Sequence, residues 1–231
     1  MTKIFLSITL MFFSFLAQSQ IKFGAIVGYN HSMPKYEASG DSLKDHTATG
    51  QSFSGGLFGS YDIHDNFELI AELLISGRHH NTTLIYDRSD MGFNYYEEHF
   101  TSVSTINFEL PILATAKKSF NKGRYGDSKT LSAFVGPVFM MNLSDSYYRS
   151  SAYRITVYNQ ESIEKEETTE SPIDFRQINL GFTAGVQYEF TFGLRVGFRY
   201  QTNFMNENTN DNFDMRYSQL QVNLGYTIFK N

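Results

Sequence analysis

The chain has 231 residues, 16% of them aromatic, and a formal net charge of −5 at pH 7. The acidic balance argues against nucleic acid as a partner, and the absence of cysteine excludes disulfides and thiol chemistry. Beyond the N-terminus no segment approaches the ~18 consecutive apolar residues of a membrane-spanning helix, so a helical membrane protein is excluded.

The N-terminus has the order of a secretory signal peptide. Lys3 is followed by an apolar run from Ile4 to Leu16, and Ala17-Gln18-Ser19 resembles a cleavage site with small residues. The sequence therefore predicts a signal peptide over residues 1–19 and a mature domain over residues 20–231. Because no cysteine follows the apolar run, a lipid-anchored lipoprotein is excluded.

In the rest of the chain, apolar residues alternate with polar residues or glycine. Successive side chains of a strand point to opposite faces of a sheet, so each such segment has one apolar and one polar face. The alternation predicts eight strands of one domain, over residues 21–30, 51–62, 67–77, 100–116, 130–143, 177–190, 194–201 and 219–228. Gly136-Pro137 in the fifth strand indicates a bulge.

The connections differ in length in a regular way. Four long polar segments, residues 31–50, 78–99, 144–174 and 203–214, are predicted to be loops, and they alternate with shorter connections. In an up-and-down meander successive connections lie at opposite ends of the sheet. Long loops then gather at one end, and both termini lie with the short turns at the other, which is periplasmic in an exported barrel.

The alternation does not by itself say which face points outward. A soluble barrel turns its apolar face inward, whereas a membrane barrel turns it toward lipid. The export signal, the segregated long and short connections, strands of about ten residues and polar faces rich in Gly, Asn, Gln, Arg and Glu all favour the membrane. We therefore predict an all-β, eight-stranded antiparallel up-and-down transmembrane β-barrel in the cell outer membrane. A secreted soluble barrel is the opposite reading.

Several short motifs resemble one family. They are Glu72-Leu73-Leu74 before Gly77, Phe108-Glu109-Leu110-Pro111-Ile112, Gly136-Pro137, and Leu220-Gln221-Val222-Asn223-Leu224-Gly225-Tyr226. Together they resemble the PorT-like outer-membrane β-barrel proteins of Bacteroidetes, over nearly all of the mature chain. The resemblance implies outer-membrane lipid and the barrel assembly machinery as partners, with Phe229 as the C-terminal aromatic that this machinery reads. It also implies a link to secretion-system components, since the namesake of the family is associated with type IX secretion.

The polar faces supply the best candidate site. Glu72, Glu109, Glu189, Arg195 and Arg199 are predicted to point into the lumen. The interior of an eight-stranded barrel is just wide enough for side chains to fill it, and charges placed there must pair. We expect a structural Glu–Arg network that plugs the barrel. A charged ion path, and hence a small ion or solute channel, is the alternative.

Metal binding is a weaker hypothesis. His79 and His80 share a predicted loop with Asp87, Asp90 and His99, but their spacing matches no dedicated metal site. The acidic run from Glu161 to Glu170 is expected to be a solvated loop, with capture of divalent cations as a minor alternative.

Catalytic signals are equally weak. Asp62 and His64 lie at a tight turn, without a serine or cysteine at a matching spacing, and Asp and Asn are ordinary turn residues. No phosphate loop, nucleotide fingerprint or zinc signature is present. We therefore assign no catalytic, cofactor or metal residues, and expect a non-enzymatic barrel with a structural, loop-display or secretion-accessory role. A membrane enzyme acting from the external loops is a further alternative.

Overall fold

The computed structural model describes residues 21–38, 44–90, 93–120, 129–157, 160–168, 175–207 and 213–230. The predicted signal peptide, residues 1–19, lies outside the described residues. Within the described ranges, no helix has both the length and the apolar composition needed to span a bilayer.

The described residues form ten strands, and every pairing between them is antiparallel. The strands are β1 (Ile21–Ala38), β2 (Lys44–Ala48), β3 (Gly50–His64), β4 (Phe67–Asp90), β5 (Phe93–Phe120), β6 (Lys129–Val157), β7 (Gln160–Thr168), β8 (Ile178–Glu189), β9 (Leu194–Asn203) and β10 (Phe213–Lys230).

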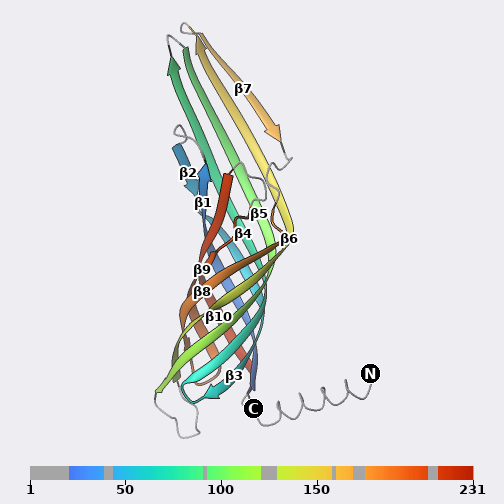
Figure 1. The fold of residues 1–231 in the computed structure, drawn as a ribbon, viewed down its shortest axis with the longest axis vertical. Coiled ribbons are helices and arrows are strands. Elements are labelled where there is room, and N and C mark those ends of the chain that lie inside the picture. The colour runs from blue at the N-terminus through green and yellow to red at the C-terminus, as the bar shows by residue number, and fades with distance from the viewer. Residues whose placement is uncertain are drawn as a thin grey trace, which may run out of the picture.

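Eight of these strands close into a ring. The order β4-β3-β1-β10-β9-β8-β6-β5 returns to β4 through the β4–β5 pairing, while β2 and β7 add to β4 and β6 outside the ring. Figure 1 shows the resulting barrel of tilted strands, with the start of β1 and the end of β10 at its lower end. In a bilayer, closure gives each backbone N–H and C=O of the ring a neighbour, which an open edge could not do. The predicted eight-stranded antiparallel barrel is confirmed.

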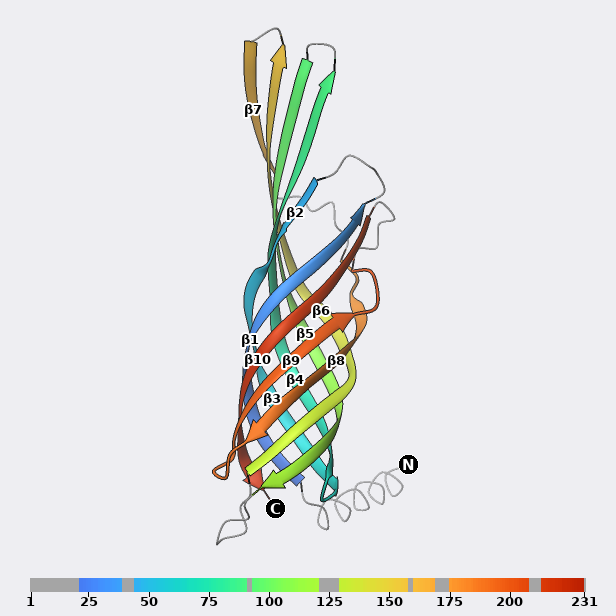
Figure 2. The same ribbon diagram turned by 90° about the vertical axis from the view of Figure 1, so that its left-hand side faces the viewer.

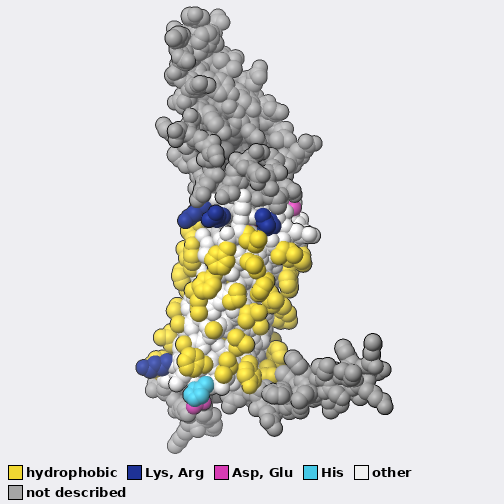
Figure 3. Space-filling model, viewed as in Figure 1, with side chains coloured by type: hydrophobic (Ala, Val, Ile, Leu, Met, Phe, Trp, Pro, Cys, Tyr) yellow, Lys and Arg dark blue, Asp and Glu magenta, His cyan; other side chains and the backbone are white. Residues whose placement is uncertain are grey.

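The apolar face points outward, as predicted. On β9 and β10, Phe198 and Leu224 are 50% and 49% exposed, whereas Arg195 and Arg199 are 5% and 3% exposed. On the face seen in Figure 3, hydrophobic side chains spread over the barrel as a belt, with Lys and Arg side chains directly above it. This arrangement inverts that of a soluble barrel and suits a shell of acyl chains.

Three of the predicted loops are largely strand. Within 31–50, β1 continues to Ala38 and β2 follows; 78–99 is the paired continuation of β4 and β5; and 144–174 contains the end of β6 and all of β7. Figure 2 shows these extensions fanning out beyond the barrel as a sheet. The prediction was wrong because it relied on the alternation of apolar and polar residues, which the sequence loses in these segments although the strand pairing continues. Thr82, Thr83 and Ile85 have high strand propensity all the same.

The fourth predicted loop, 203–214, is correct only in part. Residues 204–207 are irregular and β10 begins at Phe213, while residues 208–212 lie outside the described ranges.

The short turn between β8 and β9 lies where it was expected. Gly193 closes the turn between β8 and β9 with φ of 89°, and its N–H donates to the Phe190 carbonyl at 3.0 Å. A positive φ of this size favours glycine.

The expected bulge at Gly136-Pro137 is absent, since the pairing of β6 with β8 runs through these residues without a shift. The register shift between β5 and β6 lies instead between Ile106 and Asn107. Position 136 requires glycine for another reason, because a Cβ there would lie 1.9 Å from the Ile112 carbonyl oxygen of β5. Close approach of two backbones requires a residue without a side chain.

Candidate functional site: an ionic column in the lumen

The lumen is filled by charged side chains from six strands, β1, β3, β4, β5, β8 and β9, and from the irregular segment after β9. Because inward positions recur every second residue, Glu68 and Glu72 on β4 project inside, as do Arg195 and Arg199 on β9 and Glu109 on β5. All five are 5% exposed or less. The ionic groups form three clusters along the barrel axis, and together these clusters make up the ionic column.

The first cluster lies at the end with the short turns. Lys22 pairs with Asp62 at 3.3 Å and with Glu68 at 3.4 Å, and Lys117 also pairs with Asp62. Arg195 extends the chain, since its Nη2 lies 3.6 Å from Glu68 and 3.3 Å from Glu189. Each carboxylate of this cluster therefore has a cation beside it, as burial of charge demands.

The second cluster is the pair of Arg199 and Glu72. The Nη1 and Nη2 atoms of Arg199 donate to the two carboxylate oxygens of Glu72 at 2.6 and 2.9 Å. This bidentate geometry is the strongest form of an ion pair between these residue types. The guanidinium carbon of Arg199 lies 5.5 Å from the ring centre of Phe134, a cation–π distance that helps to fix its plane.

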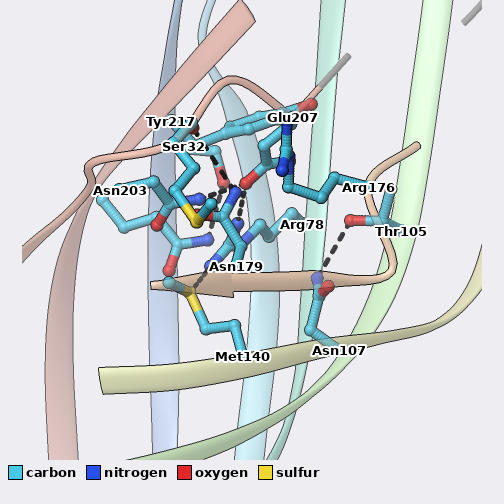
Figure 4. Close-up of polar contacts among 12 residues, drawn as sticks. Ser32, Arg78, Thr105, Asn107, Met140, Arg176, Asn179, Asn203, Glu207 and Tyr217 are labelled. Carbon is cyan, nitrogen blue, oxygen red and sulfur yellow. Dashed lines mark hydrogen bonds and ion pairs between the residues drawn. The ribbon is translucent and has the colours of Figure 1, made fainter. Parts of the chain in front are cut away.

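The third cluster lies toward the opposite end of the barrel, and Figure 4 shows its residues Arg78 and Glu207 pointing toward one another. Arg78 pairs with Glu109 at 3.1 Å and with Glu207 at 2.5 Å. Gln201 donates to Glu109 at 3.1 Å, and Asn203 donates to Glu207. Glu207 belongs to the irregular segment after β9, and its contacts with Arg78 and Asn203 hold this segment against the barrel mouth. Burial raises the pKa of the Glu207 carboxyl, although the charge of Arg78 opposes the shift.

The five predicted lumen residues are all inside, but only some of them meet. Glu72 contacts Arg199 and Glu189 contacts Arg195, whereas Glu109 pairs with Arg78. Arg78 and Glu207 were missed because both lie in segments predicted to be loops.

Two other members of the ionic column could have been predicted from the sequence. Lys22 and Glu68 occupy the polar faces of predicted strands, so the alternation that selected Glu72 could have selected them too. Asp62, the last residue of a predicted strand, and Lys117, the first residue of a predicted turn, were not recognised as lumen residues.

The remaining candidates do not converge. His79 contacts Ser104, while the neighbouring His80 points to the buried side, where it contacts Tyr217 at 2.5 Å, so the two rings lie on opposite faces of β4. Among the residues that the structure describes, no group of three or more His, Asp or Glu could hold a metal ion. The side chains of Asp87, Asp90, His99 and the run from Glu161 to Glu170 lie outside the described part.

Three predicted positions lie at the barrel ends. Asp62 is engaged by Lys22 and Lys117, and His64 is exposed beside it at the turn. Phe229 pairs with Phe23 near the end of β10 and is 54% exposed.

A closed ring with an apolar belt outside and paired charges inside defines a small transmembrane β-barrel of the outer membrane. The model of the outer membrane protein beta-barrel domain matches residues 5–227, so the chain belongs to this family and sits in the outer membrane.

Comparison with solved structures found small outer-membrane barrels. Ail, the attachment invasion locus protein of Yersinia pestis, is 12% identical with a TM-score of 0.33, covering 90% of this chain and 99% of its own. Neisserial surface protein A is 15% identical with a TM-score of 0.35, covering 89% and 97%. OprG from Pseudomonas aeruginosa is 6% identical with a TM-score of 0.38, covering 91% and 96%. Among curated proteins the sequence has no match.

Proposed function

We propose that this protein is a non-enzymatic barrel with a sealed lumen, which acts by presenting a β-sheet above the outer membrane. The observation that carries the proposal is the continuation of ring strands far beyond the apolar belt. β8 and β9 have 12 and 10 residues, whereas β4, β5 and β6 have 24, 28 and 29. A tilted membrane strand needs only about 9–11 residues.

The extension is a paired sheet. β4 and β5 stay in register from Gly77 opposite Ile106 to Asp90 opposite Phe93, and β6 pairs with both β5 and β7 in the same region. At about 3.3 Å per residue, the segment from Gly77 to Asp90 alone reaches roughly 40 Å. Continuous hydrogen bonding with the barrel favours a projection held at a defined orientation, which suits display of a binding surface.

Single-cysteine labelling tests the display, because the natural chain contains no cysteine. Ser89→Cys lies near the tip of the β4–β5 extension, and Asp65→Cys lies in the turn between β3 and β4. On intact cells, a bulky impermeant maleimide should label Ser89→Cys and not Asp65→Cys. Permeabilising the outer membrane should expose Asp65→Cys. Labelling of Asp65→Cys alone on intact cells would reject the proposed orientation.

The sealed lumen is the second part of the proposal. Six carboxylates and five cations of the described residues occupy the barrel interior as ion pairs. A barrel of this size has no room for both a charged column and an open path. Planar-bilayer recording of the refolded protein should show no steady open state. A stable conductance that changes in Glu72→Gln would favour the channel alternative.

Within the family, we propose kinship to the PorT-like proteins and an accessory role in secretion. The support is the set of motifs around Glu72, Glu109, Gly136 and residues 220–226. Deleting the gene and measuring the secreted proteins tests this role separately from the barrel. Unchanged secretion would reject the accessory role and leave the display proposal standing.

A further inference from the structure

The middle of the lumen contains a small cavity, and the buried side-chain atoms without a hydrogen-bond partner in its lining residues are all donors. Its polar lining consists of Arg195, Arg199, Gln187, Asn223 and the carboxylate of Glu72. Five buried nitrogens of these residues have no hydrogen-bond partner within the described chain: Arg195 Nε and Nη2, Arg199 Nε, Gln187 Nε2 and Asn223 Nδ2. Buried donors without acceptors are rare and costly, so such a cluster calls for an occupant.

The arginine nitrogens are the decisive ones. An amide side chain can turn to exchange donor for acceptor, whereas a guanidinium only donates. The Nη1 and Nη2 atoms of Arg199 donate to Glu72, and its Nε has no acceptor within the described chain. Nη2 of Arg195 lies within ion-pair distance of Glu68 and Glu189, but neither contact is a hydrogen bond.

Aromatic rings hold both guanidinium groups in place. The guanidinium carbon of Arg195 lies 4.5 Å from the ring centre of Phe58, and that of Arg199 lies 5.5 Å from that of Phe134. Both rings also line the cavity. The donors are therefore preorganised, and binding of an ion costs little additional side-chain entropy.

We propose that this cavity binds one small monatomic anion, with chloride as the physiological occupant. A water molecule would satisfy some of these donors, but all five unsatisfied atoms are donors, and a halide accepts hydrogen bonds without bringing protons of its own. The cavity has room for about one water-sized particle, which excludes phosphate and sulfate. The proposal goes beyond the sealed barrel and does not depend on the display role.

The ion is held by directed donors and not by an excess of positive charge. In the first two clusters, Lys22, Lys117, Arg195 and Arg199 face the carboxylates of Asp62, Glu68, Glu72 and Glu189. Binding should therefore be weak and should respond to chloride concentration.

Glycine 197 offers a variant that fills the cavity without touching a charge. Gly197 lines the cavity, and a Cβ added there would lie 3.6 Å from the Gln187 Cβ and 3.9 Å from the Asn223 Cβ, which are ordinary contacts. Gly55 is the matched control, since it lies on the outer face and an added Cβ would have no contact nearer than 3.8 Å. Gly197→Ala should lose the anion, and Gly55→Ala should keep it.

The first experiment measures thermal unfolding of the refolded protein in detergent, with chloride replaced by gluconate at constant ionic strength. A ligand that binds only the folded state raises the Tm as its concentration rises. The Tm of the natural protein and of Gly55→Ala should rise with chloride, and that of Gly197→Ala should not. A natural protein that does not respond, or an equal response of Gly197→Ala, would overturn the proposal.

The second experiment needs no variant. Crystals of the natural protein grown with bromide in place of chloride should show an anomalous scattering peak within hydrogen-bond distance of Arg195 and Arg199. A cavity without an anomalous peak, whether it holds water or nothing, would overturn the proposal.

Discussion

The barrel wall and the sheet above it are built from the same strands, yet different physics stabilises them. Within the belt, β4 places Leu69, Leu73 and Ile75 toward lipid and Glu68 and Glu72 toward the lumen. Above Gly77 the same strand continues to Asp90 and remains paired with β5, without the alternation. Hydrogen bonds between strands therefore persist where the amphipathic pattern has ended.

The contrast shows what an alternating pattern reports. It reports that the two faces of a strand meet different surroundings, here hydrocarbon and a packed ionic lumen, and not that a strand exists. The barrel should consequently be sensitive to changes on either face, and the extension should contribute little to the stability of the barrel.

The largest effect is expected inside the lumen, from Glu72→Gln. The substitution leaves Arg199 buried without its bidentate partner, and breaking a buried pair in this way costs about 3–5 kcal/mol. Urea unfolding of the protein in lipid vesicles measures the loss. The double variant Glu72→Met with Arg199→Met is the control, because replacing both partners by apolar residues should recover much of the stability. An unchanged midpoint for Glu72→Gln would contradict the plug.

On the lipid side, Leu224→Arg is expected to cost slightly less. Leu224 lies on β10 between Val222 and Tyr226, all three on the outer face of the belt. Arginine at the bilayer midplane of a barrel costs about 2–4 kcal/mol, and the cost falls toward the interfaces. The same urea titration measures it. A neutral outcome would mean that this face does not contact acyl chains.

At the end of the barrel with the short turns, Gly193→Ala tests the turn between β8 and β9. Because Gly193 has φ of 89°, alanine there should cost about 1–2 kcal/mol of stability. Gly55→Ala, on the lipid face with ordinary contacts, serves as the matched control and should unfold like the natural protein. Equal midpoints for the two variants would show that the turn does not need a positive φ.

The smallest effect is expected from shortening the extension. Removing residues 82–101 and joining Asn81 to Ser102 through an Asn-Gly turn preserves the observed pairing of these two residues. Because the belt and the ionic column remain intact, the urea midpoint of the barrel should stay unchanged. A large loss would show that the extension stabilises the barrel as well as projecting from it.

The same contrast explains what could be predicted from the sequence. Glu72 and Arg199 were found because they lie on the polar faces of clearly alternating strands. Their pairing was not fixed by alternation, since partners across a lumen depend on strand tilt and register, which no single strand encodes. Arg78 and Glu207 were lost because one lies just above the belt and the other in an irregular segment, where the pattern gives no signal.

The central claim is that apolar side chains of the ring face lipid while the alternate residues fill the lumen. A spin-label scan of β10 from Leu220 to Ile228 in lipid vesicles tests it directly, since the chain has no cysteine to interfere. Labels at even positions should be accessible to dissolved oxygen, and labels at odd positions should be shielded from oxygen and from a water-soluble nickel complex. Shielded even positions with odd positions open to the nickel complex would contradict the account.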